Sequence, residues 1–417
     1  MNRKVVVTGL GAISGLGVGV EANWNRVLRG NSAIRPIETG GWNDIADLEI
    51  SGVASWLDEA DVSAALPDRD LRKLGRLDAF SKYALIADHE AVGQAGCEGS
   101  PAFASRTAVI VGCGSNGNAT LDRAYQRLFV DRSIRAHPQT IPTSMTSAPA
   151  SHIAMMLGVH GPTFVLSSAC ASSSHALGEA MHMIRAGRVD IAIAGGTEAC
   201  ISLGPWSAWQ SLGVLAPDTC RPFSVDRKGM VLGEGAAMLV LESEDHALAR
   251  GATILGEVEG YGATSDAGQI TAPRQDTIEV ALRNALADAG VDKSEPALIA
   301  AHGTGTPLND QCEAAALRNV YGADLARSDV IATKSAHGHL IGASGALQFL
   351  LGIKGMAAGM APPVLNHLGN DPECALPLAF EAKPISSKVL VSNSFAFGGL
   401  NAVLVGRSAY RDQPAFT

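Results

Sequence analysis

The stretch that decides the fold is FVLSSACASSSH, residues 164–175, which places one cysteine between two different hydrophobic periodicities. Residues 164–166 form a short apolar run that is typical of a buried strand. From Cys170 to Gly187 the apolar residues recur at helical spacing, and a glycine commonly ends a helix. A strand, a tight turn and a helix in this order predict a doubly wound α/β fold.

The same order of short strands and helices recurs along the whole chain. Further strands are expected at residues 5–7, 107–111, 191–194 and 236–241, and then at 256–258, 297–301, 330–332 and 389–391, with a helix at 277–289. Charged residues and a glycine cluster at residues 244–252, between one completed strand and the next, so we expect a boundary there. The chain is therefore predicted to consist of two similar halves that share one core, residues 1–250 and 251–417.

The composition is that of an ordinary globular protein. Of the 417 residues 47% are apolar and 18% are charged, and the formal charge is −9, so disorder is excluded and no basic surface for nucleic acid is indicated. The longest apolar stretch, residues 347–365, is interrupted by Lys354 and two prolines, so no membrane span is expected. A secretion signal contains an uninterrupted apolar stretch, but glycines interrupt the apolar residues at the N-terminus, so no secretion signal is expected. Seven cysteines without a CxxC pair indicate a reducing compartment, and the expected location is the cytoplasm.

Cys170 has the setting of a nucleophile. At the joint between strand and helix its thiol is expected to meet the free N–H groups and the positive dipole end of the helix, which favour the thiolate. The alanines and serines around it leave room for a large acyl group. The alternative for Cys170 is a buried structural cysteine. The other six cysteines lack these neighbours, and we predict that they fill positions in the core or on the surface.

Two histidine segments follow expected strands in the second half. AHGTGTP, residues 301–307, carries His302 into a loop whose threonines and glycines bring hydroxyl and backbone donors to a ligand. KSAHGHLIGASG, residues 334–345, carries His337 and His339 into a run of small residues. A single histidine is commonly structural, but two such loops together with a cysteine at a strand-to-helix joint indicate an acyl-transfer centre.

Two other kinds of site fit the residues less well. His337 and His339 have the spacing of metal ligands, and a hydrolase site could be completed by His302 and Asp310. No acidic residue accompanies the histidine pair, however, and a lysine lies close to it in sequence, so no metal is predicted. The glycines of residues 9–17 suggest a dinucleotide loop but lack GxGxxG spacing, and we expect a tight turn from a strand to a helix there.

A third segment, NSFAFGGLN at residues 393–401, puts two aromatic side chains among glycines after the last expected strand. Such residues usually belong to the core and to a turn. If the segment is a loop packed against Cys170, the ring of Phe397 gates an acyl pocket and its N–H helps to bind an oxyanion.

These segments, in this order and spacing, resemble the β-ketoacyl-acyl-carrier-protein synthases, and among them the class II elongating condensing enzymes. The matching strings are VVVTGLG at 5–11, SAC at 168–170, AGG at 194–196, RPF at 221–223, GEGA at 233–236, the two histidine segments, and FGG at 397–399. The resemblance covers nearly the whole chain. It implies a five-layered αβαβα thiolase fold of two pseudo-symmetric halves, a homodimer, and no cofactor or metal.

The resemblance also implies a reaction, the decarboxylative Claisen condensation. An acyl chain held on a cysteine is extended by two carbons from a malonyl thioester, and both groups arrive on an acyl carrier protein. The implied catalytic residues are Cys170 as acyl acceptor, His302, His339 and Lys334, with Glu313 as the acidic partner of the lysine. His339 is chosen over His337 because the family pattern ends in Gly-His. Substrate contacts are expected from Thr304, Thr306, Phe395, Phe397 and Ser115.

Several residues depart from the pattern of housekeeping members and leave the natural acyl chain open. Ala396 and Leu400 replace the usual glycine and threonine, Ser115 replaces an apolar pocket residue, and Asn309-Asp310 is similar to polyketide and nodulation-type relatives. A specialised ketosynthase of those types is therefore the alternative to a fatty-acid enzyme.

Other members of the superfamily fit less well. Thiolases carry a second cysteine on the loop where Phe397 stands, and initiating synthases use a Cys-His-Asn set. Non-catalytic chain-length factors, which pair with a true synthase, lose the nucleophile that Cys170 supplies here.

One basic run stands out in this acidic chain. Arg69, Arg72, Lys73 and Arg76 have the i, i+3, i+4, i+7 spacing of one helix face. Because the carrier proteins of such systems are acidic, the run is a candidate docking surface. A solvated helix face is the equally supported alternative.

Overall fold

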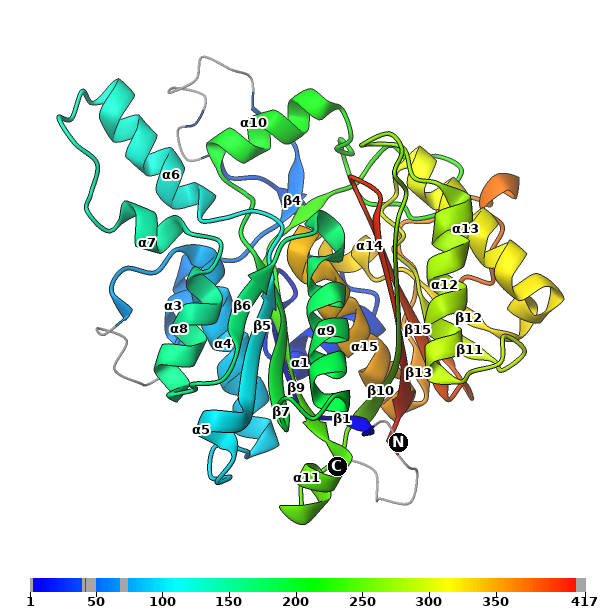
Figure 1. Cartoon of the computed structure of the whole chain (residues 1–417). Coiled ribbons are helices and arrows are strands. Elements are labelled where there is room, and N and C mark those ends of the chain that lie inside the picture. The colour runs from blue at the N-terminus through cyan, green and yellow to red at the C-terminus, as the bar shows by residue number, and fades with distance from the viewer. Residues whose placement is uncertain (1–2, 40–41, 43–49, 68–73, 410–417) are drawn as a thin grey trace.

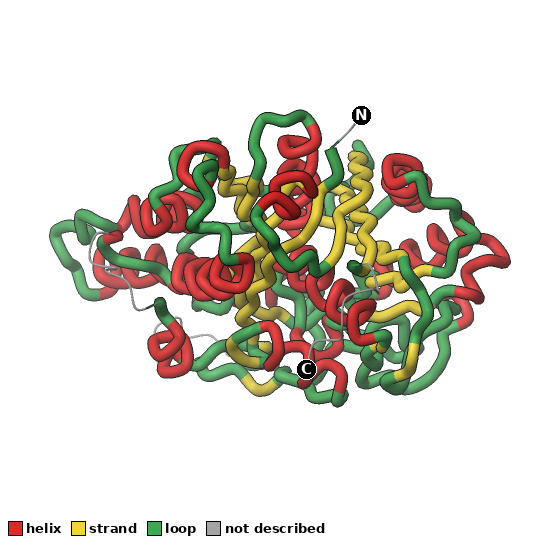
Figure 2. Tube along the Cα trace, turned by 90° about the horizontal axis from the view of Figure 1, so that it is seen from below, coloured by secondary structure: helices red, strands yellow, loops and turns green. Residues whose placement is uncertain are grey.

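Helices and strands alternate in five layers in the computed structural model, which describes residues 3–39, 42, 50–67 and 74–409 (Figure 1). Seen from below, the strands run through the middle of the molecule with helices on both sides (Figure 2). The layer order is helix, strand, helix, strand, helix, in agreement with the αβαβα expectation, and the two strand layers are the two ends of one continuous 11-stranded sheet.

The strands form two groups with the same internal pattern. The first is β6 (Thr163–Leu166), β5 (Thr107–Gly112), β7 (Ile191–Glu198), β9 (Gly235–Ser243) and β1 (Val5–Ser14). The second is β12 (Asp329–Ile331), β11 (Ala297–Ala300), β15 (Val389–Ala396), β16 (Leu400–Ser408) and β10 (Gly256–Ser265). In each group the first three strands are parallel and the last two are antiparallel to their neighbours, and the groups meet where β1 pairs with β10.

The helices cover both groups and fill the space between them. The outer layers are α4 (Ala79–Ala95) with α8 (Ala148–Leu157), and α12 (Gln275–Ala289) with α13 (Pro307–Tyr321); the middle layer is α9 (Ser172–Arg185) with α15 (Ser344–Ala358). The stretch 341–358 is apolar and long enough to span a membrane, but 83% of it is buried in the protein. This burial is what a helix in the middle of five layers requires.

Shorter elements connect these layers. They are β2 (Gly17–Val18), α1 (Val20–Leu28), β3 (Arg35–Pro36), β4 (Val53–Ser55), α3 (Glu59–Ala65), α5 (Phe103–Arg106), α6 (Asn118–Tyr125), η2 (Gln126–Val130), α7 (Thr140–Ser144), η3 (Ala169–Ala171), α10 (Leu203–Leu212), β8 (Leu232–Gly233), α11 (Glu244–Ala249), η4 (Gly322–Arg327), α14 (Lys334–His337), η5 (Ile341–Ala343), β13 (Met360–Ala361), η6 (Pro372–Cys374) and β14 (Lys383–Pro384).

Every expected strand overlaps an observed one, but the expected turn at residues 9–17 is wrong. Strand β1 runs through Gly9 and Gly11 to Ser14, and the chain turns only after that. A Cβ on Gly9 would lie 2.0 Å from the carbonyl oxygen of Ala91, and one on Gly11 would lie 1.9 Å from that of Ala87. These glycines therefore let helix α4 approach the strand closely and do not end it.

Two expectations around the first quoted stretch also need correction. Strand β6 is the edge of its sheet, and Phe164 is 38% exposed, so the strand is not fully buried. The helix begins at Ser172, two residues after Cys170, because Ala169 has a left-handed φ of 49° and Ala169–Ala171 forms a 3₁₀ turn. Cys170 thus lies in the turn that precedes α9.

Candidate active site

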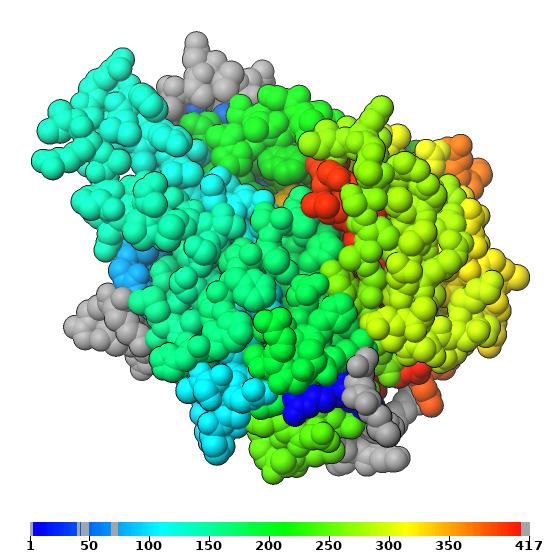
Figure 3. Space-filling view, in the orientation of Figure 1, coloured from blue at the N-terminus to red at the C-terminus, as the bar shows by residue number. Residues whose placement is uncertain are grey.

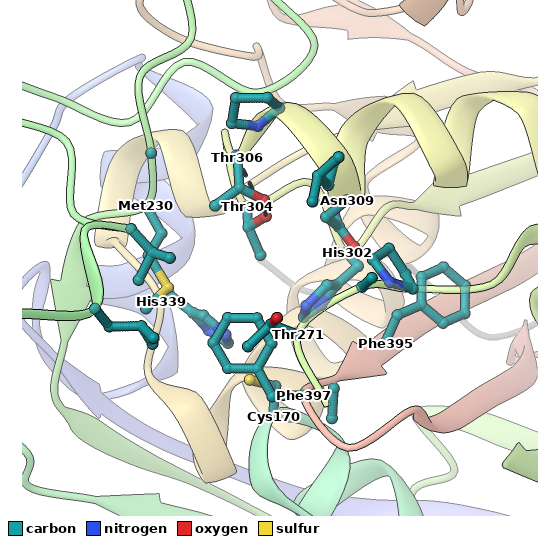
Figure 4. A pocket seen from close by; sticks show the side chains of 18 of the residues that line it. Cys170, Met230, Thr271, His302, Thr304, Thr306, Asn309, His339, Phe395 and Phe397 are labelled. Carbon is teal, nitrogen blue, oxygen red and sulfur yellow. Dashed lines mark hydrogen bonds between the residues drawn. The ribbon is translucent and has the colours of Figure 1, made fainter. Parts of the chain in front are cut away.

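Three side chains from distant parts of the sequence converge at the centre of the molecule (Figure 4). Cys170 comes from the turn before α9, His302 follows β11, and His339 follows α14. Their sulfur and nitrogen atoms lie within 4.8 Å of one another, and the two imidazole rings are 5.3 Å apart and nearly perpendicular. All three residues are buried. The tertiary structure therefore brings the expected cysteine and the two expected histidines together.

Both histidines are neutral, and each has one ring nitrogen without a hydrogen-bond partner. Burial, and next the positive charge of Lys334, lower the pKa of His302 and of His339 well below 6.5. The Nδ1 atom of His339 is 2.7 Å from the hydroxyl of Ser344. Nδ1 of His302 and Nε2 of His339 are buried and have no hydrogen-bond partner. A neutral imidazole carries one N–H, so each ring can donate to an oxygen that enters this space.

Cys170 is not the ready thiolate that the sequence suggested. Burial raises the pKa of its thiol to about 11, although the charge of Lys334 and a hydrogen bond from the backbone N–H of Phe397 act in the opposite direction. The free energy needed to remove the thiolate from water is larger than the stabilisation that Lys334 and the Phe397 N–H provide. Burial therefore favours the thiol form of Cys170 over the thiolate.

Lys334 and Glu313 are both buried at the site but do not form the expected ion pair. Among the described residues no carboxylate lies within 4.0 Å of the Lys334 ammonium, whose hydrogen bond goes to Oε1 of Gln348 at 2.8 Å. Glu313 instead accepts from the backbone N–H groups of His302 and Gly303, at 2.8 Å each. Its role is to fix the start of the histidine loop, which the spacing of the sequence could not indicate.

Two cavities meet at Cys170. The larger has a volume of about 400 Å³ and is lined by Thr304, Thr306 and Asn309, among others. The smaller, of about 270 Å³, lies behind the cysteine and is lined by Ser115 among others. Cys170 therefore borders two separate cavities.

Phe397 lies between the two cavities. It lines both of them, its ring stands in front of Cys170, and its centroid is 6.2 Å from that of Trp209 (Figure 4). Phe395 belongs to the end of β15 and not to a loop, and its ring is 6.0 Å from that of His302. The hairpin that carries both rings reaches the surface between the two halves, as the red patch in Figure 3.

Glu198 is a residue of the smaller cavity that the sequence analysis missed. Its buried carboxylate accepts from the N–H groups of Gly114 at 2.8 Å and Gly342 at 3.0 Å, and from the hydroxyl of Ser115. It ties together the loops on either side of the cavity. A charged residue at the end of a buried strand, two positions after AGG at 194–196, was the available signal.

His337 and Asp310 lie outside the central cluster. Both ring nitrogens of His337 have partners, the hydroxyl of Thr333 at 3.0 Å and the carbonyl of Gly338 at 2.8 Å. Asp310 accepts from the N–H of Phe223 at 2.7 Å and supports the backbone beneath the threonine loop. The four-residue metal set considered from the sequence is therefore not assembled.

The basic run can be followed only in part. Arg69, Arg72 and Lys73 lie outside the described residues. Arg76 is exposed and lines a surface pocket of about 130 Å³ together with Arg123, Arg127 and His137, among others.

Comparison with known proteins shows which family shares this sequence. The chain matches the family model of the N-terminal domain of β-ketoacyl synthases at residues 2–247 and that of their C-terminal domain at residues 255–367. Nodulation protein E of Rhizobium leguminosarum bv. trifolii is 42% identical over 409 residues, which cover 98% of this chain and 100% of the relative. The 3-oxoacyl-[acyl-carrier-protein] synthase 2 of Staphylococcus aureus (strain COL) is 34% identical, covering 97% and 98% of the two chains.

Solved structures agree with these matches. The ishigamide ketosynthase/chain length factor superposes with a TM-score of 0.89 at 34% identity, covering 98% of this chain and 100% of that one. A β-ketoacyl synthase from Burkholderia phymatum STM815 gives a TM-score of 0.88 at 33% identity with the same coverage. With both domains matched in order and the whole length shared, this chain has the thiolase-like fold and belongs to the β-ketoacyl synthase family.

Proposed function

We propose that the protein is a 3-oxoacyl-[acyl-carrier-protein] synthase that extends a Cys170-bound acyl chain with malonyl-[acyl-carrier-protein]. The observation that carries this proposal is the meeting of one thiol and two neutral imidazoles, within 4.8 Å, where two cavities join. A cavity on either side of the nucleophile suits a reaction in which the acyl chain stays in place while a second thioester arrives.

The first half-reaction transfers the acyl group to the cysteine. The Cys170 sulfur attacks the carbonyl carbon of the acyl thioester, its proton passes to the departing carrier thiolate, and the old C–S bond breaks as the new one forms. The N–H of Phe397 already donates to this sulfur, so it lies close enough to support the oxyanion of the intermediate.

The second half-reaction uses the histidines. Malonyl thioester loses CO₂, and the electron pair of the broken C–C bond forms an enolate whose oxygen accepts N–H groups from His302 and His339. The enolate carbon then attacks the acyl carbonyl on Cys170. The C–S bond breaks, the cysteine thiolate takes up a proton from the solvent, and a 3-oxoacyl thioester two carbons longer leaves on the carrier.

A specialised ketosynthase, of the polyketide or nodulation type, is the second candidate. It is favoured by the polar groups in the smaller cavity, where Ser115, Asn118 and Glu198 stand, and by the likeness to nodulation protein E. Polar side chains suit an acyl chain that carries oxygen better than a purely hydrocarbon chain. A non-catalytic partner role is less well supported because the nucleophile and both histidines are in place.

Mass spectrometry of the purified chain tests the proposed function. Incubation with acyl-carrier-protein thioesters of increasing chain length should give an acyl adduct on Cys170, and addition of malonyl-[acyl-carrier-protein] should release a 3-oxoacyl product. The chain length and degree of unsaturation that react best separate the fatty-acid enzyme from the specialised one. A protein that forms no adduct with any donor would be a partner subunit.

Replacing Phe397 with alanine should change which acyl lengths react and leave stability nearly intact. The side chain is half-buried between the cavities, and the following Gly398 and Gly399 have left-handed φ angles of 83° and 69°, which suit a moving turn. We expect the relative rates of Cys170 acylation across chain lengths to shift. Loss of about 3–5 kcal/mol of unfolding free energy with unchanged relative rates would instead mark a fixed core aromatic.

The pocket that includes Arg76 is the proposed docking surface for the acidic carrier protein, together with the basic run that precedes it. A ketosynthase of a type II polyketide system that resembles this chain, at 27% identity and a TM-score of 0.88, was solved with its acyl-carrier protein. Arg76→Glu combined with Arg123→Glu should raise the KM for carrier-bound substrate about tenfold and leave acylation by small thioesters unchanged. Arg283→Glu, on the exposed side of α12, is the control. Equal effects on both kinds of substrate would contradict docking.

We further propose a cytoplasmic homodimer. Strand β6 has a hydrogen-bonded neighbour on one side only among the described residues, and Phe164 on this edge is 38% exposed. An open edge with an exposed aromatic ring suits pairing with a second copy. The repeated strand pattern also supports the division into related halves at residues 1–250 and 251–417.

A further inference from the structure

Gln348 lies in helix α15 of the middle layer, and both the oxygen and the nitrogen of its buried side-chain amide form hydrogen bonds. It is 1% exposed. Its Oε1 accepts from the Lys334 ammonium at 2.8 Å, and its Nε2 donates to the carbonyls of Ala300 at 2.7 Å and Asn393 at 3.0 Å. The hydroxyl of Ser392 lies 3.1 Å from the same nitrogen. These contacts tie the amide to β11 and β15 and leave its carbonyl pointing at the lysine.

Lys334 is surrounded by titratable groups but has no close counter-charge. It is 1% exposed, and among the described residues Gln348 is its hydrogen-bond acceptor and no carboxylate lies within 4.0 Å. The groups that act on it or respond to its charge are Glu313 and Asp310 from α13, Cys170, Cys220, His302, His337 and His339. Since a neutral amide does not cancel the ammonium charge, its field reaches the cysteine and the imidazoles.

We propose that Gln348 is a positioning residue that holds the Lys334 ammonium at the site through a neutral acceptor, so that no carboxylate is bonded to it directly. The positive charge held in this way has two effects. It stabilises the thiolate that Cys170 must form, and it keeps His302 and His339 unprotonated so that they can donate to an enolate. A carboxylate in place of the amide would hold the lysine equally well but would weaken both effects. The inference rests on the proposed function only for the role of the enolate.

The pH dependence of Cys170 alkylation by iodoacetamide tests the proposal without any condensation. Burial lowers the pKa of Lys334 to about 8, so its charge is present below that pH and lost above it. In the unaltered protein the logarithm of the alkylation rate should rise with pH up to about 8 and then flatten, because the thiolate loses its cationic neighbour. Lys334→Met should remove this inflection, and an inflection that persists would overturn the assignment.

Two substitutions of Gln348 separate positioning from packing. Gln348→Glu should move the inflection up by about one pH unit or more, since an adjacent anion raises the pKa of the lysine, and should slow alkylation at pH 7. Gln348→Met keeps the volume but removes the acceptor, so the inflection should weaken. Phe349→Leu, a buried change on the same helix, is the control that should lower Tm without moving the profile.

The outcomes are distinct. If both Gln348 variants lose thermal stability but keep the alkylation profile of the unaltered protein, Gln348 is only a core residue and the proposal fails. If Gln348→Glu does not fold, the profile of Gln348→Met decides by the same criterion. A protein that shows the predicted shifts but never condenses malonyl thioester would contradict the proposed function and leave the positioning role intact.

Discussion

Replacing Cys170 with alanine is expected to abolish both acyl transfer and condensation, by about 10³-fold or more. The side chain is the thiol at the junction of the two cavities, and no other described cysteine belongs to the cluster with His302 and His339. Without the sulfur there is no covalent intermediate to hold the acyl chain while the second thioester enters. Intact-protein mass spectrometry after incubation with an acyl donor should therefore show no adduct.

Cys200→Ala is the matched control for this experiment. Cys200 is 2% exposed and lines the smaller cavity, but its thiol hydrogen bonds to the carbonyl of Gly233. The Cys200 variant should keep the adduct and the condensation reaction, with changes confined to the chain length accepted. Undiminished condensation by the Cys170 variant would exclude the cysteine as the acyl acceptor.

The second large effect is expected at the histidines. His302→Ala and His339→Ala should each lower malonyl decarboxylation by about 10²–10³-fold, because each removes one donor to the enolate oxygen in a buried site. Acylation of Cys170 should suffer less, since that step depends on the sulfur and the backbone donors. Release of CO₂ from malonyl-[acyl-carrier-protein] and adduct formation, measured on the same preparation, separate the two half-reactions.

His337→Ala is the control for the choice between neighbouring histidines. Its ring is buried and both nitrogens are bonded locally, so the change should lower the free energy of unfolding while decarboxylation stays within about tenfold of the unaltered protein. A His337 variant as inactive as the His339 variant, at equal stability, would transfer the role to His337.

The lowered histidine pKa values also predict a pH dependence. Because His302 and His339 bind protons less readily in the folded state, decarboxylation should show no acid limb near pH 6.5. The unfolded chain, in contrast, protonates these rings near pH 6.5. It therefore binds more protons than the folded chain below that pH, and the free energy of unfolding should fall as the pH drops below about 6.5.

The sequence alone determined the order of the elements and singled out Cys170 as the candidate nucleophile. Short β-branched runs and helical periodicity are local properties, so the strands and helix α12 could be found from spacing. Cys170 lies among small residues, and two histidine segments follow strands. These local features predicted a single acyl-transfer centre. The motifs around them carried the family resemblance.

What the sequence could not determine are the properties that depend on packing between distant segments. Gly9 and Gly11 suggested a turn, yet they lie within a strand because α4 packs against it, and that contact spans about eighty residues of chain. The partner of Lys334 was expected to be Glu313, but the fold puts the neutral amide of Gln348 there and uses Glu313 to hold the histidine loop.

The protonation state of the site was likewise decided by tertiary structure. A helix N-terminus favours a thiolate when it is considered alone, but five layers of protein remove Cys170 from water and raise its pKa to about 11. The same burial keeps both imidazoles neutral. The residue types are given by the sequence. The pKa values depend on desolvation and on the charge of the buried Lys334, and both effects arise only when the chain folds.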